Sequence, residues 1–292
     1  MAAALVAGRV RLRTVVLNTE TPRNAVSAAS HGLLTRDGAH ASELLAVAKE
    51  QLSKYPSVEY RKQRALAVQR QPEHFEVETE AGTLRTRRLI LATGFADRIE
   101  GLEIPGLEAV YGRTVFPCPF CDGFEHADER WAAFMGDGVE HYAQVLRMWT
   151  ADLIVFTNGR TLSGEARAAL AANDIPLVES RIEALEAEGD HLRAVRTVDG
   201  EVYERDAGFI GDEFAEPATP FADQLGVPRK DNPFGRVMYE TQDGGKTQIE
   251  RLYLVGDAHR QFGGLSAASY DGATCIQHIV HELSQERWKT PN

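Results

Sequence analysis

Apolar and polar positions alternate along the first third of the chain in a way that predicts helices and strands in turn. A helix-favouring start, Ala2 to Ala7, leads into the short apolar run RTVVLN, which is typical of a buried strand. After a stretch rich in turn-forming residues, residues 42–55 have a helical pattern. Further strands are expected around 58–60, 75–77 and 88–93.

The second part of the chain repeats the order strand, helix, strand. WAAFMGDG, HYAQVLRMWT and DLIVFTNG, which span 131–159, predict a βαβ unit. Strand-like runs follow at 191–198 and 207–210, and LYLVGDAH predicts a strand before a terminal helix at 266–285. We therefore expect an α/β protein with two Rossmann-like nucleotide-binding domains, the second inserted into the first. The expected segments are 1–110 (first segment of the first domain), 111–217 (inserted domain) and 218–292 (second segment of the first domain).

Composition and charge narrow the classes of function. The chain has 292 residues, 43% of them hydrophobic, and a formal net charge of −11, so it can build a sizeable core and repels nucleic acid and anionic lipid. The apolar run at the start is too short for a membrane span, and basic residues follow it, which is wrong for a secretory signal. We expect a cytoplasmic protein with neither nucleic acid nor membrane as its partner.

Two of the three cysteines stand three positions apart, in Cys118-Pro119-Phe120-Cys121. In a reducing compartment this spacing favours a redox pair that cycles between dithiol and disulfide. Two alternatives stay open: an inert buried pair, or half of a zinc site completed by His126 and His141. Because the spacing of these histidines is unlike common zinc modules, we expect no metal.

Asp122 follows the second cysteine directly. A carboxyl group beside a thiolate can move protons to and from sulfur. Taken alone, an Asp before Gly is more often a turn residue. Its position beside the cysteine pair makes it the candidate acid/base.

Two glycine motifs are candidate nucleotide sites. Gly136 and Gly138 follow an apolar run and precede a helix, where glycines let a dinucleotide pyrophosphate approach the helix start. The third small position of that fingerprint is His141, and Arg160 is the one nearby cation in sequence for a 2′-phosphate. The second motif is the GD of LYLVGDA, at positions 256–257, where an Asp can bind a flavin's ribityl region or simply cap a helix.

Three of these motifs occur together and in order: LILATGF, CPFCDGFE and LYLVGDA. The set closely resembles the low-molecular-weight thioredoxin reductases and the relatives that oxidise dithiols in gliotoxin and holomycin biosynthesis. TPRNAVSAASHGLLTRDG and AASYDGATC are similar to the family's flavin-side segment and to the start of its last helix. The resemblance spans nearly the whole chain and implies an FAD domain interrupted by a nicotinamide domain, in a homodimer.

The resemblance also implies roles for single residues. Cys121 would face the flavin, Cys118 would exchange with the substrate, and Asp122 would be the acid/base. The cofactor-binding residues would be those at the matching motif positions: Asn18, His31, Thr93, Gly94, Gly256, Asp257, Ala267 and Ala268 for FAD, and Gly136 and Gly138 for NADPH.

Three departures from the family pattern matter. The chain begins just after the family's first strand and GxGxxG loop, which receives the FAD pyrophosphate; we expect this loop to be encoded upstream, the alternative being a chain that has lost tight FAD binding. Asn18 replaces an acidic residue, and His141 replaces the third small residue of the nicotinamide fingerprint. We therefore predict an FAD-dependent dithiol/disulfide oxidoreductase that relays electrons between its cysteine pair and NADPH or oxygen, with a slight preference for oxygen or for a donor other than NADPH. Its partner would be a thioredoxin-like protein or a small dithiol or disulfide. The competing hypotheses are a cofactor-poor binding or scaffold protein and zinc binding through the CxxC pair.

Overall fold

The computed structural model describes the chain except for residues 137, 212–213, 231–236, 261–262 and 290–292. Contacts divide it into two compact units. Unit 1 consists of Met1–Ala25, Gly32–Ala96 and Glu216–Asn292, and unit 2 consists of Val26–His31 and Asp97–Ala215. The predicted insertion of one domain into the other is confirmed. The contacts change near 96 and 215, whereas the sequence analysis divided the chain after 110 and 217.

Unit 2 is built around a sheet of five parallel strands in the order β11-β10-β9-β15-β8. The first strand of the βαβ unit, β9, lies at its centre, and the chain winds outward to both sides, as in a doubly wound nucleotide-binding fold. In sheet order the strands are Leu177–Val178, Leu153–Phe156, Trp131–Phe134, Ala207–Ile210 and Val115–Phe116.

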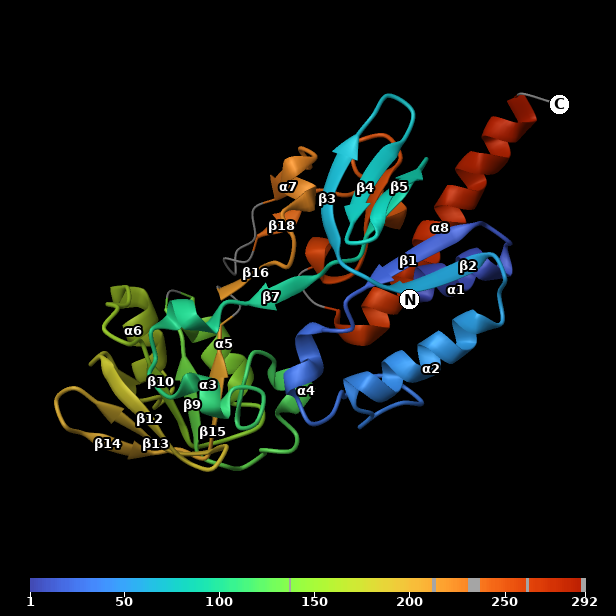
Figure 1. Ribbon diagram of the computed structural model, residues 1–292. Helices are drawn as coiled ribbons and strands as arrows, with labels where there is room; N and C mark the ends of the chain where they lie inside the picture. Colours follow the sequence, from blue (N-terminus) through green and yellow to red (C-terminus); the bar gives the residue numbers. More distant parts are fainter. Residues whose placement is uncertain (137, 212–213, 231–236, 261–262, 290–292) are drawn as a thin grey trace. The chain divides into compact units, whose positions relative to one another are not determined.

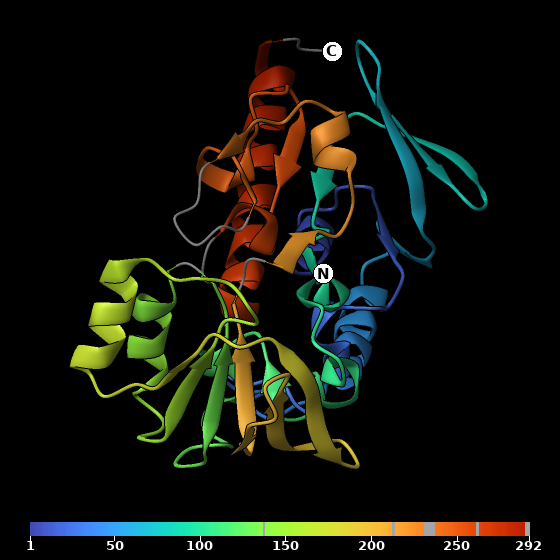
Figure 2. The same ribbon diagram turned by 90° about the vertical axis from the view of Figure 1, so that its left-hand side faces the viewer.

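Side chains of β9 alternate between two separate hydrophobic clusters. Trp131 and Ala133 belong to the cluster with helices α5 (Val139–Leu146) and α6 (Gly164–Ala172). Ala132 and Phe134 point the other way, into the cluster that contains residues of the antiparallel sheet β12-β13-β14. Helices therefore cover one face of the parallel sheet and a second sheet covers the other (Figure 2), which is why β9 is apolar throughout. The three covering strands are Ile182–Glu188, His191–Thr197 and Val202–Glu204.

Unit 1 has its core where helices α1 (Ala2–Arg9) and α8 (Gly264–Lys289) pack against strand β19 (Leu252–Leu254). The two helices come so close that a Cβ atom on Gly272 would lie 2.8 Å from the backbone nitrogen of Ala3. A larger residue than glycine would push them apart.

The remaining strands of unit 1 form small sheets. Two parallel pairs occur, β1 with β2 and β6 with β19, and an antiparallel meander is formed by β3, β4 and β5 (Figure 1). The other short elements are α7 and the pair β17-β18. The bounds are Thr14–Asn18 (β1), Ala41–Ser53 (α2), Val58–Lys62 (β2), Ala65–Arg70 (β3), Phe75–Thr79 (β4), Gly82–Thr86 (β5), Leu89–Leu91 (β6), Phe221–Gln224 (α7), Arg229–Lys230 (β17) and Met238–Tyr239 (β18).

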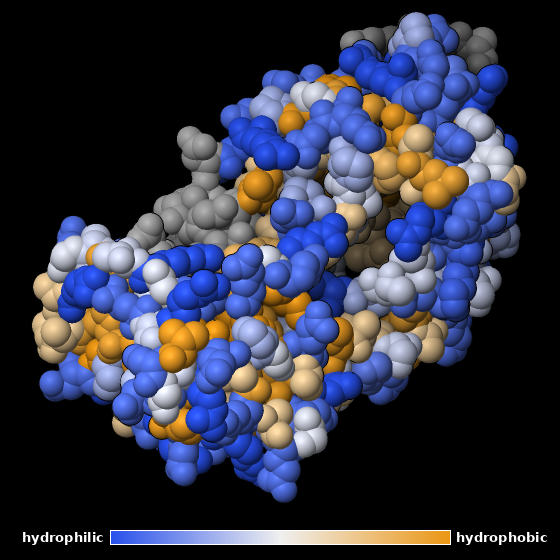
Figure 3. All heavy atoms as spheres, turned by 60° about the vertical axis from the view of Figure 1, so that its left-hand side comes forward, coloured by the Kyte–Doolittle hydropathy of each residue, from blue (hydrophilic) through white to orange (hydrophobic). Residues whose placement is uncertain are grey.

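The chain crosses between the units through two segments that pair with each other, β7 (Phe95–Asp97) and β16 (Ala215–Pro217). Short elements of unit 2 follow the first crossing: α3 (Leu107–Val110) and α4 (Pro119–Asp122). On the face drawn in Figure 3, hydrophilic residues cover most of the surface and hydrophobic residues gather in separate patches. Within the part of the chain that the structure describes, no helix is long and apolar enough to cross a membrane.

Candidate functional site

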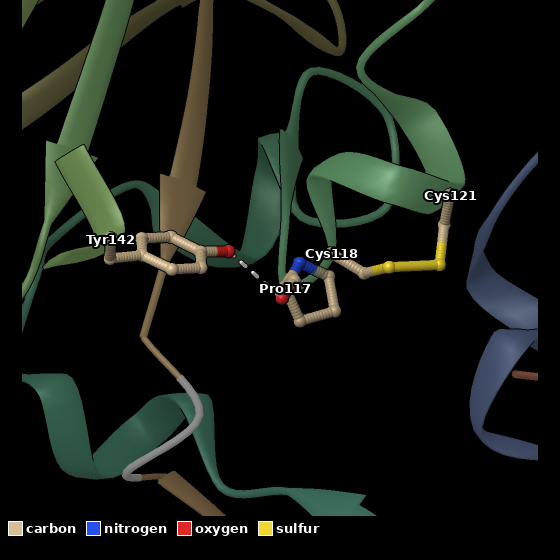
Figure 4. Close-up of a disulfide and its surroundings, with 4 residues drawn as sticks. All are labelled: Pro117, Cys118, Cys121 and Tyr142. Carbon is tan, nitrogen blue, oxygen red and sulfur yellow. Dashed lines mark hydrogen bonds between the residues drawn. A yellow bond between two sulfur atoms is a disulfide. The ribbon is translucent and has the colours of Figure 1, made fainter. Parts of the chain in front are cut away.

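The two neighbouring cysteines are joined by a disulfide at the start of α4, with their Cα atoms 5.3 Å apart (Figure 4). Cys118 is the N-cap residue of the helix, and Pro119 occupies its first turn, where a missing N–H costs nothing. The backbone N–H groups of Cys121 and Asp122 both donate to the carbonyl oxygen of Cys118, at 3.2 Å. The spacing of three residues thus lets the two cysteines pair within one helical turn.

Aromatic side chains hold this turn in place. The hydroxyl of Tyr142, on α5, donates to the carbonyl oxygen of Pro117 at 3.3 Å, directly before the first cysteine (Figure 4). On the other side, a Cβ atom on Gly123 would lie 2.5 Å from a backbone oxygen and 3.2 Å from the ring of Trp149. The ring of Phe120 packs edge-on against the same tryptophan, with ring centroids 5.3 Å apart. These contacts therefore hold the backbone on both sides of the disulfide.

The carboxyl group of Asp122 has a raised pKa. Burial raises the pKa of its carboxyl group to about 6, and the negative charge of Glu125 adds to the rise, while His31 and His126 oppose it. His126 is itself occupied, because its Nδ1 lies 2.8 Å from a carboxylate oxygen of Glu129. A carboxyl group with a pKa near neutrality can both donate and accept a proton at physiological pH.

His31 lies in unit 2, although its neighbours in sequence on the C-terminal side belong to unit 1. Its Nε2 is 3.4 Å from a carboxylate oxygen of Glu125, three residues after Asp122. The sequence analysis placed this histidine in a flavin-side segment. In the structure its ion-pair partner belongs to the dithiol segment, residues 118–125.

The second group of candidate residues lies in unit 1, at the ends of two neighbouring parallel strands. Strand β6 pairs with β19 in register, and both are followed by a turn that contains glycine. Gly94 and Gly256 both have left-handed backbone conformations, with φ of +62° and +77°, which favour glycine. Because the carboxyl ends of parallel strands share one edge of a sheet, Thr93 and Asp257 lie at the same edge, where α/β folds bind nucleotides.

Small residues line the start of α8 beside the second of these turns. A Cβ atom on Gly256 would meet the Cβ of Ala268 at 3.7 Å, and Ala267 precedes it on the helix. The backbone N–H of Gly256 donates to Asp271 at 3.3 Å. The strand ends and small side chains therefore fit a flat cofactor that approaches the backbone closely, such as FAD.

Asn18 ends β1, where the sequence analysis expected a ribose-binding residue. Its side-chain oxygen accepts the backbone N–H of Glu20 at 2.6 Å, and Glu20 has a left-handed φ of +62°. Hydrogen bonds from Lys49, Lys62 and Tyr60 lower the pKa of Glu20 to about 2. The amide oxygen of Asn18 thus supports a local turn.

The expected nicotinamide loop fits its ligand only in part. Gly138 is the N-cap residue of α5, with φ of +81° and open space beside it, and Gly136 is buried two residues after the end of β9. The first turn of the helix, however, carries Glu140, whose buried Oε2 has no hydrogen-bond partner. A carboxylate there opposes a pyrophosphate.

At the end of β10, where the 2′-phosphate would be recognised, the polar side chains already have partners within the protein. Asn158 donates to the carbonyl oxygen of Leu102 at 3.0 Å and accepts the N–H of Ile182 at 2.8 Å. The guanidinium group of Arg160 lies over the ring of Phe214, 5.4 Å from its centroid. The geometry therefore gives weaker support for NADPH than for the dithiol and the flavin.

Residues 1–272 match the family model described as pyridine nucleotide-disulphide oxidoreductase. The chain belongs to this family.

Proteins with solved structures or curated sequences are similar to this chain over nearly its whole length. A crystal structure of a putative thioredoxin reductase, TrxB, from Bacillus anthracis has a TM-score of 0.90 at 30% identity and covers 98% of this chain and 95% of its own. The crystal structure of HlmI also has a TM-score of 0.90, at 29% identity, with 99% and 90% covered. A probable thioredoxin reductase of Arthroderma benhamiae is 26% identical over 96% of this chain and 76% of its own length. The protein is a thioredoxin reductase-like oxidoreductase with two Rossmann-type domains, as the sequence predicted.

Three residues of this pyridine nucleotide-disulphide oxidoreductase escaped the sequence analysis. Glu125 is one, although the sequence CDGFE places it one helical turn from Asp122. His259 and Asp271, which bind each other at 2.9 Å, are the others, and no local pattern pairs residues twelve positions apart.

The zinc hypothesis gains no support from the described residues. No group of three or more histidine, cysteine, aspartate or glutamate side chains among them is arranged to hold a metal ion. Both sulfur atoms of the CxxC pair are bonded to each other.

Proposed function

We propose that this protein is an FAD-dependent dithiol/disulfide oxidoreductase that acts through Cys118 and Cys121. The observation that carries the proposal is the disulfide at the start of α4, followed directly by a carboxyl group whose pKa is about 6. A reactive disulfide needs a nearby group that exchanges protons with sulfur near neutral pH, and Asp122 is such a group.

The reaction with a dithiol substrate proceeds by two exchanges. A substrate thiolate attacks the Sγ of Cys118; the bond to Cys121 breaks, and Cys121 leaves with the electron pair as a thiolate. Asp122 accepts the proton of the second substrate thiol, which then attacks the mixed disulfide. Cys118 leaves as a thiolate and takes up that proton. The substrate disulfide thus has two electrons and two protons fewer than the dithiol. One of these protons is on Cys118, and the other, from the thiol that attacked first, is in solvent.

Thr93, Gly94, Gly256, Asp257 and the small residues of α8 would hold FAD, which would supply a two-electron acceptor for the reduced cysteine pair. The left-handed glycines after β6 and β19 support this assignment, since they allow a cofactor to approach the backbone.

Oxygen is the acceptor that the geometry favours. The buried Oε2 of Glu140, which has no hydrogen-bond partner, and the occupied side chain of Asn158 both oppose NADPH at the inserted domain. With oxygen as acceptor, one dithiol and one oxygen molecule give one disulfide and one hydrogen peroxide. The alternative is a reductase that uses NADPH to reduce a thioredoxin-like protein.

Two exposed aromatic side chains accompany the disulfide. Phe120, between the cysteines, is 70% exposed, and Phe124, just after them, is 82% exposed. Exposed aromatic side chains beside a reactive group suit a substrate with an apolar body. We therefore propose a small apolar dithiol; a thioredoxin-like protein is the second candidate, and the homodimer stays a prediction.

Anaerobic titration of the FAD-supplemented protein tests the proposal. A dithiol should bleach the flavin absorbance, and oxygen should restore it with one hydrogen peroxide per dithiol, whereas NADPH should bleach it poorly. Rapid bleaching by NADPH would favour the reductase. If the protein shows no flavin absorbance after FAD is added, the proposal is wrong and the competing hypothesis of a binding or scaffold protein is favoured.

A further inference from the structure

A six-residue segment, Val26–His31, belongs by its contacts to unit 2, while the chain before and after it belongs to unit 1. The segment is fixed at its first residue, where the guanidinium group of Arg113 donates to the carbonyl oxygen of Val26. Gly112 packs so closely there that a Cβ atom on it would lie 2.7 Å from the side chain of Val26. At its other end the segment places His31 beside the dithiol segment.

His31 and Glu125 form a partly exposed pair whose charges act on Asp122. Their side chains are 3.4 Å apart at the nearest nitrogen and oxygen, and they are 23% and 42% exposed. Both act on the charge of Asp122, in opposite directions: Glu125 raises the pKa of its carboxyl group and His31 lowers it.

The other histidine that faces Asp122 has a different position. Nδ1 of His126 is bound to Glu129, its carbonyl oxygen accepts the indole N–H of Trp131 at 2.8 Å, and its ring packs against Phe116 at 5.2 Å. His126 is thus held by contacts with neighbouring residues of unit 2. His31 comes from a separate segment and pairs with an exposed carboxylate.

We propose that His31 and Glu125 carry protons between solvent and Asp122, which makes His31 a positioning residue of the dithiol site that acts through Asp122. This inference rests on the proposed role of Asp122 as acid/base. An imidazole can take up and release a proton near neutral pH, and the exposed carboxylate beside it passes that proton to or from water. In each turnover the proton that Cys118 takes up is released again when the Cys118–Cys121 disulfide re-forms, and it would exit through Asp122 by this route, without change in the electron count.

The test is the reduction of the Cys118–Cys121 disulfide by dithiothreitol, which needs no flavin. Samples are quenched with N-ethylmaleimide at set times from pH 5 to 8, and the alkylated cysteines are counted by mass spectrometry. Dividing each variant's rate by that of the unchanged protein at the same pH cancels the ionisation of the reagent. The variants are His31→Gln and Glu125→Gln, with His191→Gln as control, because His191 pairs with Asp190 at 2.7 Å on an exposed hairpin of the same unit.

Opposite shifts are expected. Without His31 the ionisation of Asp122 moves to higher pH, and without Glu125 it moves to lower pH, each by about 0.5–1 unit for partly exposed charges. Added imidazole should restore part of the rate of His31→Ala, which a purely structural role would not allow. His191→Gln should leave the profile unchanged.

Two negative outcomes are distinguishable. If dithiothreitol does not reduce the disulfide of the unchanged protein, the proposed function itself is wrong. If reduction proceeds and depends on Asp122, but both variants keep the profile of the unchanged protein and imidazole has no effect, the proton route through His31 is wrong and the proposed function stands.

Discussion

Replacing Asp271 by Asn removes the charge from a deeply enclosed ionic group of unit 1. The carboxylate of Asp271 is only 4% exposed and accepts hydrogen bonds from His259 at 2.9 Å and from Arg260 at 2.7 Å. It also binds the N–H of Gly256, next to the candidate flavin residue Asp257. The substitution therefore tests whether this cluster holds the turn after β19 in place.

The expected loss of stability follows from burial. Breaking a buried ion pair by removing one partner costs about 3–5 kcal/mol. Because Arg260 is 38% exposed and Asn keeps one acceptor, we expect about 2–3 kcal/mol here.

The loss should depend on pH in a definite direction. Burial alone would raise the pKa of Asp271, but the hydrogen bonds and charges of Arg260 and His259 outweigh it and hold the pKa below its ordinary value. A carboxyl group with a lowered pKa contributes stability above its unfolded-state pKa of about 3.9, and this is lost as the pH falls through the folded-state value. The difference between the two proteins should persist from pH 5 to 8 and narrow below about pH 4.

Urea unfolding followed by circular dichroism measures the difference, and hydrogen exchange of α8 peptides locates it. Asp190→Asn is the control, since that carboxylate is 52% exposed and should cost less than about 0.5 kcal/mol. A loss below about 0.5 kcal/mol for Asp271→Asn, or one that is unchanged at pH 3, would refute the reasoning.

The other predictions concern the dithiol and the backbone. Cys121→Ser should abolish flavin reduction by a dithiol, whereas Cys118→Ser should leave a thiolate that gives a long-wavelength charge-transfer band with oxidised flavin; full turnover of the latter would overturn the assignment. Asp122→Asn should slow thiol exchange by a factor on the order of 10²–10⁴ and remove the rise in rate that the pKa of about 6 predicts between pH 5 and 7, as stopped-flow measurements over that range can check. Gly245→Ala should cost about 3 kcal/mol or more in urea unfolding, because its φ is +74° and the new Cβ would lie 2.1 Å from a backbone oxygen, while Gly164→Ala, with open space beside it, should be neutral or slightly stabilising.

The sequence by itself determined the fold class and the pairing of the two neighbouring cysteines. The apolar runs of β9 and β10 and the helix between them are local patterns, and hydrophobic periodicity records them directly. The spacing of Cys118 and Cys121 fits within one helical turn, so their pairing needs no distant contact.

Only the tertiary structure decided those features that depend on contacts between segments far apart in the sequence. Residues Ile182–Glu188, IEALEAE, are rich in helix formers yet form a strand, because pairing with His191–Thr197 and packing over the parallel sheet outweigh helix propensity. The place of His31 beside Glu125, 94 positions later in the chain, likewise follows from the path of a segment that leaves one unit and contacts the other. Local patterns record which face of an element is buried, but not which remote residue covers it.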